Sequence, residues 1–323
     1  MSKMTLAEDH GNDVKDMRSA YCESMIDLAK KDNRIVALDA DLMGAMGMKP
    51  FAKEFPERTL DCGIQEANMI GVACGLSVWG KVPFAHTFGP FCTRRACDQI
   101  FMSGAYNKAN VKVVGSDPGI TAAYNGGTHM PFEDMGIMRG IPTMTVVEPT
   151  DIAMLKDLLP QIAETYGMFY MRLVRKGVRK VYEEGSTFEI GKAVRLTEGK
   201  DVAIIASGFC VAEALDAVEM LKAEGIQARL LDMFTWKPLD EEAVLWAAET
   251  GAIVTAENHN VVNGLGSAVS CLLAGKKPTI VEMVGVQDEF GEVGPVSYLR
   301  ERFGLTAEKI VEAVHRAIAR KNA

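Results

Sequence analysis

Glu66 is the first residue whose position in the sequence could support catalysis. It stands in the segment Asp61-Cys-Gly-Ile-Gln-Glu-Ala-Asn-Met-Ile-Gly-Val-Ala-Cys-Gly75, which runs from an expected strand into a helix of small residues. The positive end of the helix dipole stabilises a carboxylate in the first turn. A glutamate at a helix start is often only part of the helix start signal. Gly71 and Gly75 favour a functional interpretation, because they allow a backbone or a ring to approach closely.

A pair of phenylalanines suggests a place for a flat ligand. Phe88 and Phe91 are separated by a Gly-Pro pair, which predicts a turn that presents both rings on one side. Paired phenylalanines are also common core residues. His86 lies at the end of the same expected strand, and its type is equally consistent with a core histidine and with a substrate contact.

A long loop from 115 to 131 contains the best candidate for proton transfer. The loop is rich in Gly, Asn and Pro, and loops of this length inside compact domains are usually functional. His129 lies near its end, close to Glu133 and Asp134, which suits general acid–base chemistry. The segments 257–260 and 290–294 are loops of the same kind, for which ordinary polar turns are an equally good interpretation.

These residues are spaced along an alternation of strands and helices that predicts an α/β protein with mostly parallel sheets. We expect a leader over 1–14, a first domain over 15–180, and a second domain over 190–323. The charged segment 175–188, which contains two glycines, is the expected linker. The expected strands are 34–42, 59–64, 82–88, 111–116, 143–148, 169–174, 201–206, 228–232, 252–257 and 279–283. The expected helices are 15–30, 66–78, 91–105, 150–165, 210–224, 239–249, 263–274, 294–302 and 306–320.

Composition excludes several classes of protein. The 323 residues are 48% hydrophobic and carry a formal net charge of −8, which opposes a nucleic-acid surface. No apolar run approaches the length of a membrane span, and no secretory or transit signal is visible, so we expect a cytoplasmic protein that binds no membrane. Seven cysteines without a CxxC pair indicate buried thiols, and we assign no residue to metal.

The motifs, taken in order, resemble one family. GIQE before a glycine-containing helix, AHTFGPF, and a loop that ends in NGGTH are together similar to the pyrimidine-binding domain of the transketolase family. The part from about residue 190 resembles the C-terminal domain of that family. The resemblance implies the thiamine-diphosphate-binding fold for the first domain. It covers nearly the whole chain.

The resemblance also implies a cofactor and a partner. In this family, thiamine diphosphate binds between domains of different subunits, and a separate domain with a GDG motif holds the diphosphate and its Mg²⁺ or Ca²⁺. These 323 residues contain no GDG, no P-loop and no GxGxxG after a strand. The chain therefore resembles the C-terminal subunit of a split transketolase, which transfers a two-carbon ketol unit from a ketose to an aldose. An N-terminal subunit and an α2β2 assembly are implied.

Residue roles follow from the resemblance. Glu66 matches the glutamate that binds the pyrimidine ring nitrogen, and His129 matches a histidine that contacts substrate oxygens. Catalytic roles are thus expected for Glu66, His129 and His86. The expected cofactor-binding residues are Glu66, Phe88, Phe91, Asp41 and Ile64. The expected substrate-binding residues are Arg18, Arg175, Asp117 and Asn125, the two arginines being suited to a sugar phosphate.

Three positions depart from the family pattern. Asp117 stands where many transketolases have His, Asn125 where they have Asp, and Ala45 where a phosphate-binding Ser is common. The cofactor half of the expected site is thus intact, while the donor half is altered. The usual sugar phosphates are therefore in doubt as substrates.

Other classes also fit parts of the pattern. A 1-deoxyxylulose-5-phosphate synthase-like enzyme and the β subunit of a 2-oxo acid dehydrogenase use the same cofactor. The former normally keeps all its domains on one chain, and the latter has other motifs after the catalytic Glu. A non-catalytic regulatory subunit is the third alternative, but a scaffold has no physical need for Glu66, Phe88 and His129 together.

Overall fold

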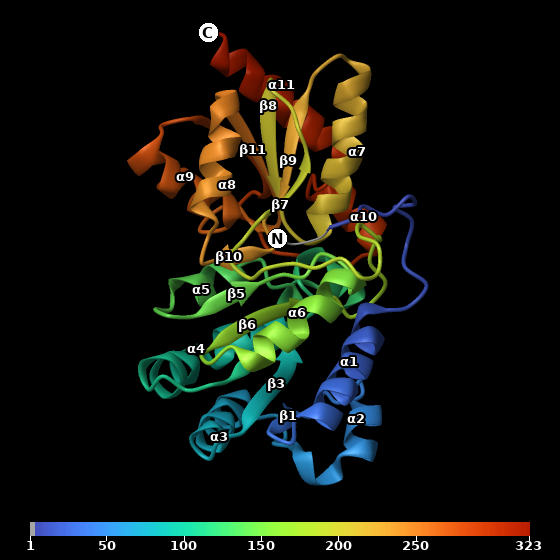
Figure 1. The fold of residues 1–323 in the computed structure, drawn as a ribbon, viewed down its shortest axis with the longest axis vertical. Coiled ribbons are helices and arrows are strands. Elements are labelled where there is room, and N and C mark those ends of the chain that lie inside the picture. The colour runs from blue at the N-terminus through green and yellow to red at the C-terminus, as the bar shows by residue number, and fades with distance from the viewer. Residues whose placement is uncertain (1–3) are drawn as a thin grey trace.

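The computed structural model describes residues 4–323, which form two α/β domains stacked along the long axis (Figure 1). The first domain is built on a seven-stranded sheet with the strand order β10-β5-β6-β4-β3-β1-β2. All its neighbouring strands are parallel except the β10–β5 pair. Its strands are β1 (Ile35–Asp39), β2 (Thr59–Asp61), β3 (Val82–Phe88), β4 (Lys112–Ser116), β5 (Thr145–Val147), β6 (Phe169–Leu173) and β10 (Thr235–Lys237).

The helices of the first domain connect these strands. Six are α-helical: α1 (Met17–Lys31), α2 (Lys49–Glu54), α3 (Glu66–Val78), α4 (Cys97–Gln99), α5 (Asp134–Gly140) and α6 (Ile152–Glu164). Five others are 3₁₀ or π turns: η1 (Pro56–Arg58), η2 (Phe91–Arg95), η3 (Ile100–Tyr106), η4 (Gly119–Asn125) and η5 (Gly127–His129). The helical stretch expected over 91–105 is present, but it is interrupted at Ala96, and two π-helical segments flank a single short α-helical turn.

The second domain has a five-stranded sheet with the order β12-β11-β8-β9-β7, in which only the β7–β9 pair is antiparallel. Its strands are β7 (Val194–Thr197), β8 (Val202–Ala206), β9 (Ala228–Asp232), β11 (Ala252–Asn260) and β12 (Ile280–Val286). Its helices are α7 (Phe209–Ala223), α8 (Glu241–Ala247), η6 (Ala248–Thr250), α9 (Leu265–Lys276), α10 (Val296–Arg302) and α11 (Ala307–Lys321). Figure 1 shows α7 and α11 on one side of this sheet and α8 and α9 on the other.

Burial explains which elements the sequence identifies. All residues of β1, β3, β4, β6 and β8 are buried, as is usual for strands covered on both faces. Mostly parallel α/β architecture is confirmed. The pattern did not predict α2, α5, β7 and β10. These elements are short, and tertiary contacts determine where they begin and end. No helix among residues 4–323 is both long and apolar enough to span a bilayer.

Two segments tie the domains together. Strand β10 follows β9 in the chain yet pairs with β5, so the second half of the sequence completes the sheet of the first domain (Figure 1). The linker also pairs with the N-terminal segment, through isolated bridges between Leu6 and Tyr182 and between Asn12 and Arg179. The expected leader is thus held against the expected linker.

A buried arginine lies at the junction of the two domains. Arg172 of β6 is 1% exposed, and its Nε is 2.8 Å from an oxygen of Asp134 while its Nη1 is 2.8 Å from Glu148 Oε1. The same Nη1 lies 3.2 Å from the backbone oxygen of Asn258 in the second domain. Tyr170 also donates to Asp134 at 2.6 Å. Burial opposes ionisation of Asp134, but Arg172 holds the pKa of that carboxyl below its usual value.

We predict that Arg172→Ala strongly destabilises the chain. The change leaves two buried carboxylates without their cation, which costs about 3–5 kcal/mol. Denaturant unfolding of the variant measures the loss, and Arg195→Ala, at an arginine stacked on Trp246 in the second domain, is the control. A loss for Arg172→Ala no larger than that of the control contradicts the assigned role.

Candidate active site

The candidate site lies at the carboxyl ends of the strands of the first sheet, where open α/β sheets bind ligands. Strand β3 ends at Phe88, and β4 ends just before Asp117. Strand β6 ends two residues before Arg175. Because parallel strands share an edge, residues far apart in the sequence meet there.

Glu66 is the first residue of α3 and is almost completely buried, with 1% exposure. The carboxylate lies near the helix N-terminus, as expected. Both of its oxygens are 2.8 Å from Nη1 of Arg95. The guanidinium carbon of Arg95 lies 4.4 Å from the centroid of the Phe91 ring. Glu66, Arg95 and Phe91 therefore form one contact group.

Phe88, Phe91 and His129 form a cluster of three rings. The centroid distances are 5.9 Å for Phe88 to Phe91, 5.9 Å for Phe88 to His129 and 5.2 Å for Phe91 to His129. The hydroxyl of Thr128 lies 2.8 Å from His129 Nδ1, within hydrogen-bond distance. The structure thus brings together the two phenylalanines and the histidine that the sequence singled out.

An ion pair closes the other end of the ring cluster. Arg175 Nε is 3.0 Å from Asp117 Oδ1, and the Arg175 guanidinium lies 5.3 Å from the Phe88 centroid. Asp117 is 1% exposed and has a φ of 60°, an unusual backbone conformation for a residue other than glycine. Burial raises the pKa of Asp117, and the charge of Arg175 opposes that rise.

His86 does not reach the ring cluster through a polar atom. Its Nε2 is 2.6 Å from the hydroxyl of Tyr21, and its Nδ1 is 2.9 Å from the backbone oxygen of Leu38. The side chain is fully buried, and burial lowers the pKa of His86 to about 4. Of the two interpretations left open by the sequence, the core histidine is the one that this geometry favours.

The remaining predicted residues lie around the site rather than in one contact group. Arg18 donates to the backbone oxygen of Ala45 at 2.9 Å and is 3.5 Å from Asp16. Asp41 has a φ of 60° and donates its backbone N–H to Asp61 at 3.0 Å. Ile64 and Asn125 are exposed.

Sequence reasoning missed Arg95. The signal was present, because Arg95 follows Phe91 by four residues, a spacing that brings two side chains together on a helix. Arg94 was also missed, and it lies 3.2 Å from Glu133 and 3.1 Å from the backbone oxygen of Thr128. A run of two arginines after an aromatic turn is otherwise typical of a solvated helix surface.

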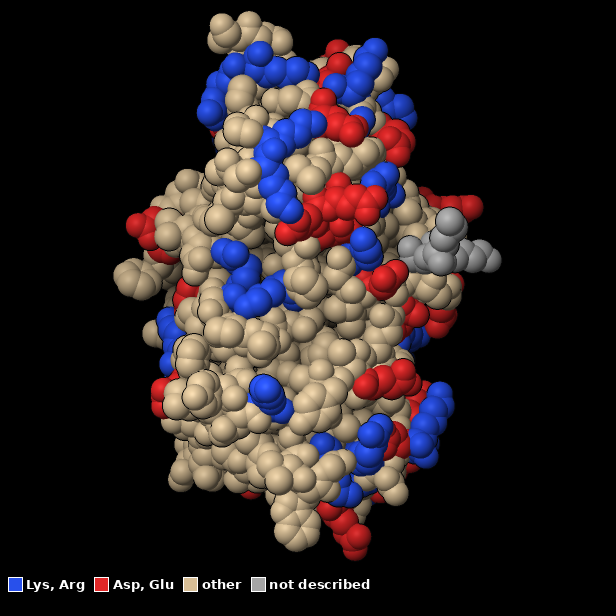
Figure 2. All heavy atoms as spheres, turned by 60° about the vertical axis from the view of Figure 1, so that its left-hand side comes forward, with Lys and Arg blue, Asp and Glu red and all other residues tan. Residues whose placement is uncertain are grey.

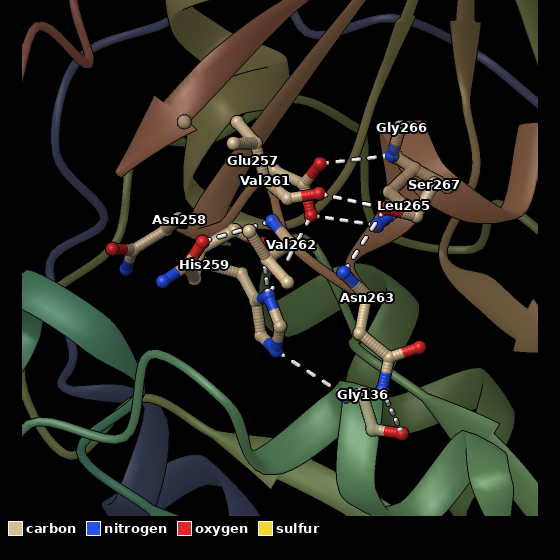
Figure 3. Close-up of polar contacts among 12 residues, drawn as sticks. Gly136, Glu257, Asn258, His259, Val261, Val262, Asn263, Leu265, Gly266 and Ser267 are labelled. Carbon is tan, nitrogen blue, oxygen red and sulfur yellow. Dashed lines mark hydrogen bonds and ion pairs between the residues drawn. The ribbon is translucent and has the colours of Figure 1, made fainter. Parts of the chain in front are cut away.

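The segment 257–260 joins the domains instead of forming a ligand loop (Figure 3). Glu257 accepts the backbone N–H groups of Leu265 and Gly266, at 2.6 and 2.8 Å, and so caps α9. The backbone N–H of Gly136 donates to His259 Nε2 at 3.2 Å. Burial raises the pKa of Glu257 to about 8 and lowers that of His259 to about 4. Glu257 and His259 therefore use their polar atoms for hydrogen bonds within the protein.

The segment 290–294 contacts the loop that carries His129. A Cβ added to Gly127 would lie 2.2 Å from the backbone oxygen of Gly291, so the two backbones touch. A Cβ added to Gly291 would lie 2.6 Å from Met130 Sδ. The second domain therefore helps to fix the position of the His129 loop.

We predict that Gly127→Ala displaces this loop and lowers stability by about 1–3 kcal/mol, the usual range for overpacking. The nearest atom is a backbone oxygen, which cannot move away as a flexible side chain can. Thermal unfolding gives the stability. Gly275→Ala is the control, because it adds a methyl group to open space on α9. Equal melting temperatures for the two variants contradict the contact.

The first domain also presents exposed apolar side chains. Figure 2 shows few charged side chains over much of this domain on the side that carries α3 and α4. Gly71 and Gly75 of α3 have open space where a side chain would be. The exposed apolar residues of this region are Ile64, Val78, Trp79, Phe101, Met102 and Tyr106. A largely apolar face of this kind is typical of a protein interface.

Comparison with known families agrees with the fold. Residues 13–180 match the family model "Transketolase, pyrimidine binding domain", and residues 191–310 match "Transketolase, C-terminal domain". The chain therefore belongs to the transketolase family.

Individual relatives narrow the assignment. The chain is 53% identical to the "6-deoxy-6-sulfo-D-fructose transketolase subunit" of Clostridium sp. (strain MSTE9), over 95% of both chains. It is 42% identical to the "Putative transketolase C-terminal section" of Methanocaldococcus jannaschii, over 93% of this chain and 95% of the relative. A solved structure, "Split gene transketolase, inactive beta4 tetramer", is 43% identical with a TM-score of 0.88, over 94% of this chain and 99% of the other.

The chain is thus a C-terminal subunit of a thiamine-dependent transketolase. This confirms the function expected from the motifs. The two related thiamine enzymes and the non-catalytic subunit are not favoured, because these relatives are described as transketolase subunits or sections.

Proposed function

We propose that this chain provides the pyrimidine half of a thiamine diphosphate site, and that a separate N-terminal subunit provides the diphosphate and metal half. The observation that carries the proposal is the buried Glu66 carboxylate, which shares its partner Arg95 with the Phe91 ring. Among residues 4–323 no cluster of His, Cys, Asp or Glu is arranged to hold a metal ion. The divalent ion is therefore assigned to the partner.

The residues present fit the pyrimidine ring. Glu66 can accept a hydrogen bond from a ring N–H, and Phe88 and Phe91 can pack against the ring. When bound, the cofactor supplies an electron sink for breaking and forming carbon–carbon bonds next to a carbonyl. Glu66 holds the proton at the ring nitrogen, the phenylalanines exclude water, and His129 donates to substrate oxygens. These roles are those of a two-carbon transfer from a ketose to an aldose.

The largely apolar face around α3 is the surface that we assign to the partner subunit. Glu66 begins the same helix that carries Gly71, Gly75 and Val78, so a partner on this face would also cover the cofactor pocket. An α2β2 assembly in the cytoplasm is part of the proposal. Activity of this chain then depends on the partner.

The donor end supports a substrate with a single terminal negative charge. A phosphate carries about −1.5 to −2 at neutral pH, whereas a sulfonate carries −1. Asp117 offsets the charge of Arg175 at 3.0 Å, and Ala45 offers no hydroxyl. The Clostridium relative is named for 6-deoxy-6-sulfo-D-fructose. We therefore propose a sulfonated ketose as donor, with a sugar phosphate as the alternative.

The decisive test is reconstitution. We predict that Glu66→Gln, assembled with the N-terminal subunit, loses most thiamine-dependent two-carbon transfer and keeps the fold. The amide cannot accept and share the ring proton as a carboxylate does, and general acid–base groups contribute typically 10²–10⁴-fold. Turnover of 6-deoxy-6-sulfofructose with an aldose acceptor gives the activity.

The matched control is Glu57→Gln, which makes the same change at an exposed position in η1. It is expected to keep wild-type turnover. Wild-type turnover by Glu66→Gln with bound cofactor would contradict the role of Glu66. No transfer by the wild-type complex with any ketose would contradict the proposed function itself.

A second prediction concerns the donor anion. Arg175→Ala is expected to lower kcat/KM for anionic donors by about 10- to 150-fold, because a charge-assisted hydrogen bond contributes about 1.5–3 kcal/mol. The companion Asp117→Asn removes the opposing charge, and so shifts preference toward the phosphorylated donor. Steady-state kinetics with the sulfonated, phosphorylated and uncharged ketoses measure both effects.

Arg195→Ala, at another arginine stacked on an aromatic ring, is the control and should leave all three donors unchanged. If Arg175→Ala lowers kcat/KM equally for charged and uncharged donors, Arg175 does not bind the anionic group. An unchanged donor preference in Asp117→Asn would remove Asp117 from the specificity argument.

A further inference from the structure

We infer that Arg95 is a displaceable occupant of the pyrimidine pocket, which neutralises Glu66 in the free subunit and must leave when the cofactor ring binds. The inference deepens the proposed function and rests on it. Arg95 thereby affects how tightly the cofactor binds, but it takes no part in the reaction.

The guanidinium occupies the place that a bound ring would need. Like an aminopyrimidine ring, the guanidinium is flat and carries N–H donors. Its Nη1 lies 2.8 Å from both Glu66 oxygens, which is hydrogen-bond distance. Its central carbon lies 4.4 Å from the Phe91 centroid, a distance suited to a flat group stacked on the ring. A ring cannot bind Glu66 and Phe91 in this way while Arg95 stays.

Burial explains why the free subunit needs such an occupant. Glu66 is 1% exposed, and an unpaired carboxylate at that depth is unfavourable. Arg95 is the only cation of the described chain with an ion pair to Glu66. Without a ligand, the pair is therefore the favoured state.

Arg95 is also free to leave. Its side chain is 48% exposed, and within residues 4–323 its side-chain polar and ring contacts are to Glu66 and Phe91. It ends the π-helical turn η2, where the backbone departs from helical angles at Ala96, with φ −109° and ψ 14°. Rotation about its side-chain bonds is enough to move the guanidinium into solvent.

The occupant lowers the apparent affinity for the cofactor. When only a fraction of molecules has an open pocket, the measured dissociation constant rises by the inverse of that fraction. Removing the guanidinium should therefore tighten cofactor binding, because the cofactor no longer has to displace an ion pair that stabilises the free subunit. A residue that only supported the fold would not tighten binding when removed.

The first test uses the free full-length chain and needs no cofactor. Arg95→Ala is expected to lower the melting temperature, because it leaves a buried charge unpaired. Glu66→Gln is expected to lower the melting temperature in the wild-type background and to raise it in the Arg95→Ala background. Arg58→Ala, at an arginine stacked on Phe55 at 4.0 Å, is the control background in which Glu66→Gln should behave as in wild type.

The second test uses the complex with the N-terminal subunit. Titration with thiamine diphosphate and Mg²⁺ is expected to give a dissociation constant at least about fivefold lower for Arg95→Ala than for wild type, in line with removal of a competing closed state. Arg95→Lys retains the charge without the flat fork and should lie between the two. Stopped-flow binding should show a rate that saturates with cofactor concentration in wild type and not in Arg95→Ala.

The outcomes separate the two proposals. The same sign of the Glu66→Gln effect in both backgrounds overturns the occupant role, whatever the cofactor does. A reversed sign with unchanged or weaker cofactor binding in Arg95→Ala also overturns it, and leaves the proposed function intact. Failure of the wild-type complex to bind thiamine diphosphate overturns the proposed function, and the occupant role falls with it.

Discussion

The buried charge of Arg172 is the constraint on which the arrangement of the site depends. Its guanidinium neutralises Asp134 and Glu148 and also binds the Asn258 carbonyl of the second domain. Asp134 begins α5 directly after the loop that carries His129. One side chain from the middle of the sheet thus fixes where that loop ends and where the second domain lies. Apolar packing alone, which has no direction, would not set these positions.

The second domain acts on the site through its contacts with loops, while its own polar groups stay bound within the protein. Asn258 Oδ1 accepts the backbone N–H of Ile120 at 3.0 Å, and Gly291 touches Gly127. These contacts lie near both ends of the η4–η5 region, whose last residue is His129. The domain is therefore a support that holds a long loop in one conformation, which the role proposed for His129 requires.

The sequence predicted the parts of this structure that burial dictates. Strands β3, β4 and β6 lie where continuous apolar runs predicted them, and Glu66 and the Phe88–Phe91 pair lie near one another as expected. Strand β10 was not predictable, because its three residues pair with a strand nearly ninety positions earlier. The burial of His86 and the ion pair of Arg95 depend on which side chains lie next to each residue in the fold. The periodicity of apolar residues in the sequence does not predict these neighbours.

The same physics explains why the proposed pyrimidine site needs an occupant when no cofactor is bound. A carboxylate becomes a selective partner for a ring N–H when water is removed from it, but burial also makes an empty pocket unfavourable. Ion pairs meet this cost at both ends of the ring cluster, with Arg95 on Glu66 and Arg175 on Asp117. A ligand that enters between them must offer its own hydrogen bonds in exchange. Under the inferred role of Arg95, the free subunit is held in a neutralised state, and only a ligand that brings its own N–H donor can replace the Arg95–Glu66 pair.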